Sequence, residues 1–158
     1  MQASEEVWTA KGDYMKSQAE VTENMRAILI DWLIEVHLKF KLRCETLFIT
    51  VNLIDRYASA QNIAKAELQL VGVAAMLIAA KYEEIYPPIL KDYVHICNKS
   101  FSGPQILAME QKILFAVDFD VKSHSPLRFL ERLGKHAALT EEAFFFAQYL
   151  MEIALLDY

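Results

Sequence analysis

Glycine and proline are scarce in this sequence, which contains four of each among its 158 residues. Apart from Gly72, each of them falls where a helix boundary is expected. No segment alternates apolar and polar residues convincingly, and no Asn-Gly or Asp-Gly pair signals a hairpin. The sequence therefore predicts an all-α protein.

Cysteine is also rare, and the residue patterns of catalysis are missing. The two cysteines, Cys44 and Cys97, form neither a disulfide framework nor a zinc spacing, and they fit a reducing, intracellular compartment. No glycine-rich phosphate loop and no nucleophile elbow occurs. We therefore expect a protein that is not an enzyme, with no catalytic residues, no metal and no cofactor. The histidines show no metal-ligand spacing either; they are His37, His95, His124 and His136.

Positive charge is in deficit. The net charge is −5 and no basic block occurs, which argues against nucleic acid as the main partner. The longest run without a charged or hydrogen-bonding side chain is Leu70 to Ala80, shorter than the roughly 20 residues that span a bilayer. Residues 1–6 lack the apolar region of a targeting peptide. We expect no membrane partner.

Apolar residues are in excess instead, since hydrophobic residues make up 54% of the chain against an ordinary value of about 45–50%. They are densest in residues 66–88, where alanine, leucine and methionine favour a helix over a strand. A helix that is apolar on every side belongs in the middle of a bundle. This helix changes to Lys81-Tyr-Glu-Glu84 at its end, and Pro87-Pro88 stops it. When a buried helix ends in exposed charged and aromatic residues, that end is a candidate part of a binding site.

Elsewhere the apolar residues recur at the three- and four-residue intervals of amphipathic helices. The spacing predicts helices over residues 24–41, 45–60, 89–98, 102–118, 125–134 and 140–158. We expect Ser102, Ser125 and Thr140 to cap the last three of these helices, and Gly134 to end its own. The helix that begins after Thr140 is too apolar for a surface helix, so we interpret it as the beginning of a second domain.

Three segments carry a resemblance to a known family. They are Met25-Arg-Ala-Ile-Leu-Ile-Asp-Trp-Leu-Ile-Glu35, Leu68-Gln-Leu-Val-Gly-Val-Ala-Ala-Met-Leu and Lys81-Tyr-Glu-Glu-Ile-Tyr-Pro-Pro88. Together with Asp55-Arg56 and Met109-Glu110, they closely resemble the cyclin box in order and spacing. The likeness covers about residues 14–158. It is most similar to the mitotic A/B group, and residues 149–158 lean toward the B type.

The resemblance implies two stacked five-helix domains that bind and activate a cyclin-dependent protein kinase in cell-cycle control, in the nucleus and cytoplasm. We expect residues 1–20 to form an extended arm with Val7, Trp8, Tyr14 and Met15 as candidate anchors. Residues 21–120 would form a five-helix cyclin box, and residues 121–158 a linker and the opening helices of a truncated C-terminal domain. The helix that precedes the first box would be mostly missing.

A first surface is implied by the resemblance around Lys81 and Glu110. In the family, the matching lysine and glutamate hydrogen-bond the kinase backbone beside its mobile regulatory helix. The alternative is an internal salt bridge that only orients two helices, and for Leu114 and Phe119 the alternative is ordinary core. Glu83 and Glu84 read better as a solvated helix end than as a metal site. The expected kinase-binding residues are Lys81, Tyr82, Glu84, Ile85, Glu110, Leu114, Phe119 and Val121.

A second surface implied by the resemblance is a shallow groove that docks short basic-hydrophobic peptides of substrates or inhibitors. An apolar shelf would take a leucine while Glu35 attracts a cation. The alternative is that its apolar members are core. Arg26 and Asp55 would form a buried structural ion pair that contacts no ligand. The expected docking residues are Met25, Ile28, Leu29, Trp32, Glu35, Leu68 and Gln69.

A transcription-type adaptor with the cyclin fold, which binds other proteins or DNA, is the alternative function. It would need a basic surface that faces DNA. The acidic balance, with only Lys39, Lys41 and Arg43 clustered, speaks against it.

Overall fold

The computed structural model describes residues 10, 12–123 and 125–157, and within them it contains helices and no strand. The all-α prediction is confirmed. Val7, Trp8 and His124 lie outside the described residues. The elements are η1 (Tyr14–Ser17), α2 (Glu23–Phe40), α3 (Cys44–Ala60), η2 (Lys65–Glu67), α4 (Leu68–Glu83), α5 (Leu90–Ile96), α6 (Gly103–Ala116), α7 (Pro126–His136) and α8 (Glu141–Ala154).

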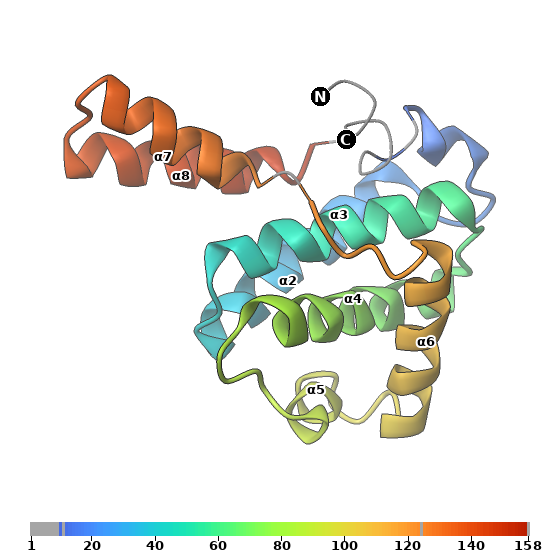
Figure 1. Cartoon of the computed structure of the whole chain (residues 1–158). Helices are drawn as coiled ribbons and strands as arrows, with labels where there is room; N and C mark the ends of the chain where they lie inside the picture. Colours follow the sequence, from blue (N-terminus) through green and yellow to red (C-terminus); the bar gives the residue numbers. More distant parts are fainter. Residues whose placement is uncertain (1–9, 11, 124, 158) are drawn as a thin grey trace.

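Helix α4 occupies the centre of the molecule. Every residue from Leu70 to Ala80 is buried. The helices α2, α3, α5 and α6 all pack against it, and Figure 1 shows them arranged around the green ribbon of α4. Small side chains such as those of Ala74, Ala75 and Ala79 let these neighbours approach closely. The expected five-helix bundle is thus built around the expected apolar helix.

Most of the expected helix starts have the local contacts that the sequence suggests. Thr140 Oγ1 accepts a hydrogen bond from the main-chain N–H of Ala143, and the main-chain N–H and hydroxyl of Ser102 both donate to Gln105 Oε1. Ser125 precedes α7 as expected but makes no side-chain capping bond. The predicted end at Gly134 is wrong, since α7 continues to His136. A Cβ at Gly134 would lie 3.4 Å from Leu139 and from Phe144, an ordinary van der Waals distance, so packing does not require glycine there.

Helices α5 and α6 end two residues earlier than the spacing predicts. After each helix, two successive residues adopt left-handed backbone conformations, Asn98 and Lys99 after α5 and Asp118 and Phe119 after α6. Such a conformation costs about 1–2 kcal/mol for a residue with a side chain. Tertiary packing therefore determines these two turns, and no glycine marks them in the sequence.

Helices α7 and α8 form a pair that lies beside α3 (Figure 1). No residue of α8 is fully buried, and Phe145, Phe146 and Tyr149 are exposed. The pair is attached through polar contacts: Gln148 Nε2 donates to Cys44 Sγ at 2.7 Å, and the thiol donates to Glu152 Oε1 at 3.4 Å. Burial and this hydrogen bond to Glu152 raise the pKa of Cys44 to about 12, so the thiol stays protonated and remains a donor.

We expect Gly72→Ala to destabilise the protein by about 1 kcal/mol. The added Cβ would lie 2.8 Å from Leu29 Cδ1, and overpacking of this kind costs about 1–3 kcal/mol, whereas the gain in helix propensity is about 1 kcal/mol. In a Leu29→Ala background the clash disappears, so the same change should become stabilising. Urea denaturation of the wild type, the two single variants and the double variant measures the change in the free energy of unfolding that Gly72→Ala causes in each background. A loss of equal size in both backgrounds would contradict this account.

Stability should also fall at mildly acidic pH because of His37, which is buried on α2 with Nδ1 unpaired. Burial lowers the pKa of His37 below its ordinary value of 6.5, and the carboxylates of Glu152 and Glu84 only partly oppose this shift. Below about pH 6.5 the unfolded chain therefore binds a proton that the folded chain resists, and the free energy of unfolding decreases. Urea denaturation at about pH 7 and pH 5.5 should show a smaller decrease for His37→Gln than for the wild type. Equal decreases would exclude His37 as the cause.

Candidate protein-binding surfaces

Lys81 and Glu110 form an ion pair between the end of α4 and the middle of α6. Lys81 Nζ lies 2.7 Å from Glu110 Oε1 and 2.9 Å from Oε2. The C-terminal end of a helix dipole also favours the lysine cation. The lysine side chain is 49% exposed while that of Glu110 is only 12% exposed. The buried carboxylate thus holds an accessible ammonium group, which can still donate to a group on another protein.

Large apolar side chains emerge near this pair. Tyr82 and Ile85 follow Lys81 at the end of α4 and are exposed, Ile85 to 83%. Leu114 lies one turn after Glu110 on α6 and is half-buried, whereas Val121 is buried. The structure therefore brings together charged and apolar residues of the expected kinase-binding set from α4, α6 and the segment after α6. We call Lys81, Tyr82, Ile85, Glu110, Leu114 and Phe119 the α4–α6 surface.

Phe119 lies on the outside of the protein and not in its core. Its left-handed backbone follows the end of α6, and its main-chain N–H donates to Leu114 O at 2.8 Å. The ring is 60% exposed and meets the exposed Phe115 edge to face, at 5.2 Å between centroids. Residues held in strained backbone conformations cluster at functional sites. The ordinary-core alternative does not apply to Phe119.

Glu84 has internal partners in this structure. Its Oε1 accepts hydrogen bonds from the main-chain N–H of Arg43 and from the hydroxyl of Thr46. The Arg43 guanidinium pairs with Glu83 at 2.9 Å and approaches Glu45 at 3.5 Å. These contacts tie the end of α4 to the start of α3. No pattern in the sequence predicts these contacts of Arg43, because residues 43 and 84 are far apart in the chain and no periodicity connects them.

A shallow apolar groove lies between α2 and α4 and has a volume of about 280 Å³. That volume lies at the small end of known ligand pockets and suits one or two apolar side chains. Leu29 and Leu68 are buried in its floor, and Ile28 stands exposed at its side. Glu35 does not line the groove, and Lys65 does. The lining residues are Met25, Ile28, Leu29, Trp32, Lys65, Leu68 and Gln69.

The sequence contains one local hint of Lys65, which does not by itself place the residue in the groove. It lies three residues before Leu68, the spacing that brings side chains to one face where a helix begins. The three-residue helix η2 leads directly into α4, so Lys65 and Leu68 are neighbours in the folded protein.

Arg26 connects three parts of the chain. Its Nε and Nη2 atoms donate to the two carboxylate oxygens of Asp55, each at 2.8 Å, and Nη1 donates to the carbonyl oxygens of Leu155 and Asp157. The hydroxyl of Tyr14 also donates to Asp55. Burial and the Asp55 carboxylate raise the pKa of Tyr14, which therefore stays neutral. This network joins η1, α2, α3 and the chain after α8, and its charges face inward.

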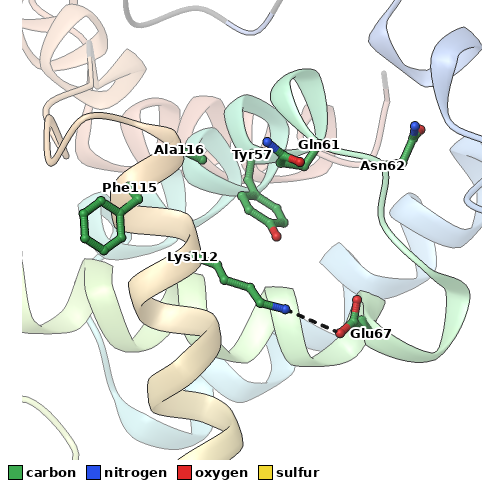
Figure 2. Close-up of a pocket in the computed structure, with 7 residues that line it drawn as sticks. All are labelled: Tyr57, Gln61, Asn62, Glu67, Lys112, Phe115 and Ala116. Carbon is green, nitrogen blue, oxygen red and sulfur yellow. Dashed lines mark ion pairs between the residues drawn. The ribbon is translucent and has the colours of Figure 1, made fainter.

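A further hollow of about 530 Å³ opens between the end of α3, η2 and α6 (Figure 2). Figure 2 shows the side chain of Lys112 extending toward Glu67, with Nζ and Oε1 3.9 Å apart. Because both charges are partly exposed and compensate each other, the hollow has no clear preference for an anion or a cation. Lys112 is nevertheless a useful comparison for Lys81, since each is a half-exposed lysine paired with a glutamate of another element.

Residues 10, 12–123 and 125–157 contain neither a metal-binding cluster nor a membrane-spanning helix. That part of the chain contains no group of three or more His, Cys, Asp or Glu side chains that could hold a metal ion. None of its helices has the length and apolar character needed to cross a membrane.

Comparison with known proteins gives consistent matches. The family model described as cyclin, N-terminal domain, matches residues 1–122. The chain is 46% identical over 147 residues to G2/mitotic-specific cyclin-B of Hydra viridissima, and the match covers 93% of this chain and 38% of the relative. It is 44% identical over 158 residues to cyclin-B1 of Xenopus laevis, which covers 100% of this chain and 40% of that protein. The chain thus spans about two fifths of the length of these curated relatives.

The fold is also found in a solved structure. A viral cyclin from herpesvirus saimiri superposes with a TM-score of 0.87 over 99% of this chain and 70% of that chain, at 23% sequence identity. At that identity the match is evidence for the fold alone.

The Arg26–Asp55 and Lys81–Glu110 ion pairs should contribute very different amounts to the free energy of unfolding. Asp55→Asn leaves the Arg26 charge buried without its partner, and we expect a loss of about 3 kcal/mol or more. Glu110→Gln removes the buried carboxylate and leaves the half-exposed Lys81 ammonium group in contact with water, and we expect a loss of less than about 1 kcal/mol. Urea denaturation with detection by circular dichroism measures both. Losses of similar size would mean that Lys81 has a structural role comparable to that of Arg26.

Proposed function

Because the chain belongs to the cyclin family, we propose that it acts as a regulatory subunit that binds and activates a cyclin-dependent protein kinase in mitotic cell-cycle control. Its B-type relatives, at 44–46% identity, support the assignment to the mitotic group. As a regulatory subunit it has no catalytic activity of its own. We further propose that it works in the nucleus and cytoplasm and contacts neither nucleic acid nor membrane.

The α4–α6 surface carries this proposal. It combines an accessible lysine ammonium group, a carboxylate that orients it, and exposed apolar side chains from two helices. Buried aromatic and apolar anchors usually supply most of the binding energy of an interface, while polar groups fix its register. Tyr82, Ile85 and Phe119 are suited to the first role, and Lys81 to the second through hydrogen bonds to backbone carbonyls of the kinase.

The mechanism follows from differential affinity. A kinase whose regulatory helix moves between inactive and active positions is shifted toward the active one by any protein that binds that conformation more tightly. A shift from 1% to 99% active requires a difference in affinity of about 10⁴-fold. A rigid surface is well suited to this task, because its shape matches one position of the helix and not the other. The packing of α4 on four sides provides that rigidity.

The groove between α2 and α4 gives the second part of the proposal. It would dock short peptides of substrates or inhibitors that carry an apolar anchor and a basic residue. Its apolar floor accommodates the anchor. Glu35 is exposed on α2, where it can pair with the basic residue of the peptide. Docking at this groove would raise the local concentration of a substrate beside the bound kinase.

Binding of the purified chain to a cyclin-dependent kinase from the same organism, measured by isothermal titration calorimetry, tests the first part. We expect Lys81→Glu to weaken binding by at least ten-fold and to reduce kinase stimulation in parallel, because the reversed charge repels the same carbonyl groups. Lys112→Glu is the matched control: it reverses the charge of another half-exposed, paired lysine, and binding should stay within about two-fold of the wild type.

Unchanged circular dichroism melting of both variants would show that each remains folded. Equal binding by Lys81→Glu and the wild type would place the kinase contact away from the α4–α6 surface. Absence of binding by the wild type would contradict the proposed function of this chain.

A further inference from the structure

Among the described residues that line the groove between α2 and α4, one is charged, and that residue is a cation. Lys65 lies in η2, its side chain is exposed, and it lines the groove together with six uncharged residues. In the described part of the chain, no carboxylate oxygen lies within 4.0 Å of its ammonium nitrogen. The carboxylate of nearby Glu20 accepts a hydrogen bond from the main-chain N–H of Lys65. The ammonium group is therefore available to a ligand in the groove.

Lys65 and Glu35 lie toward opposite ends of the groove. The hydrogen bond to Glu20, a residue just before α2, places Lys65 near the Met25 end of that helix. Glu35 lies on the same helix one turn beyond Trp32, outside the lining at the other end. Ten residues separate Met25 from Glu35, which corresponds to about 15 Å along the helix axis. The apolar floor thus lies between the ammonium group of Lys65, whose main chain is bonded to the Glu20 carboxylate, and the carboxylate of Glu35.

We propose that Lys65 is a specificity residue that selects docking peptides with an acidic residue on one side of the apolar anchor, in addition to a basic residue on the other. An extended peptide advances about 3.3–3.6 Å per residue, so a span of about 15 Å places the acidic and basic residues four or five positions apart. The apolar anchor lies between them and enters the groove. This inference rests on the proposed docking function of the groove and names its ligand class.

The two end charges control the choice and orientation of the peptide more than its overall affinity. An exposed ion pair contributes about 0.2–1 kcal/mol, which corresponds to a preference of up to about five-fold. A peptide in the reversed orientation would bring each of its charges beside a like charge and would be disfavoured by both ends. A purely basic peptide would satisfy Glu35 and meet repulsion at Lys65. The groove therefore prefers peptides with separated opposite charges.

Fluorescence polarisation with synthetic nine-residue peptides tests this proposal. Each peptide carries one arginine and one leucine, with either aspartate or asparagine four positions from the arginine on the far side of the leucine. Peptides with the arginine before the leucine and with the arginine after it are both included, because the two groove charges fix where the peptide's charges lie but not the direction of its chain. For the wild type, we expect the better of the two aspartate peptides to bind about three-fold more tightly than its asparagine counterpart. The difference should fade at 0.5 M salt.

Variants at Lys65 distinguish charge selection from a general effect of the aspartate. Lys65→Gln should bind both peptides equally, and Lys65→Glu should prefer the asparagine peptide. Lys91→Gln removes the same charge from an exposed position on α5 and should keep the wild-type preference. Lys65 is exposed and is not part of the core, so all three variants are expected to fold.

The outcomes separate this inference from the function on which it rests. Equal binding of aspartate and asparagine peptides by the wild type, or a preference that Lys65→Gln retains, would overturn the specificity role and leave the docking groove intact. Failure of every peptide to bind would overturn the docking function and this inference together. Neither result bears on the α4–α6 surface, because kinase binding is measured separately.

Discussion

The structure depends on the burial of residues 70–80 of α4. Because α4 is apolar on every side from Leu70 to Ala80, other helices must cover it, and the whole bundle is arranged to do so. The same packing creates both candidate surfaces. The C-terminal end of α4 emerges with Lys81 and Tyr82, and its N-terminal end forms one wall of the groove. Gly72 helps to form the groove, since its missing side chain leaves the space that Leu29 occupies in the groove floor.

Two ion pairs with similar distances serve different purposes because their surroundings differ. The Arg26–Asp55 pair is enclosed and its remaining donor binds carbonyl groups near the end of α8, so its charges are committed to the fold. The Lys81–Glu110 pair has one enclosed and one accessible member, so the ammonium group can be shared with a partner. Burial, and not the length of the ion pair, separates a structural contact from a recognition contact.

Parts of the candidate site could be predicted from the chain and parts could not. The resemblance gave the residues of both surfaces, and the apolar lining of the groove contains six of the seven expected docking residues. It gave Phe119 as a surface residue with ordinary core as the alternative, and the left-handed turn after α6, which only packing selects, decides between the two. The resemblance also gave Glu35 and not Lys65 as the charged residue of the groove, because the position of Lys65 depends on how η2 approaches α2. Local patterns do not contain such distances.

The sequence by itself determined the all-α class, the central position of α4, most helix starts and the membership in the cyclin family. Hydrophobic periodicity, capping residues and long motifs are local properties, so they can be read along the chain. The tertiary structure alone decided which charges are buried, which aromatic rings face outward and which charged side chain lines the groove. These features arise where segments distant in the chain meet, such as Arg43 with Glu83 or Lys65 with Glu20. Their energies depend on burial and distance, which only the folded molecule defines.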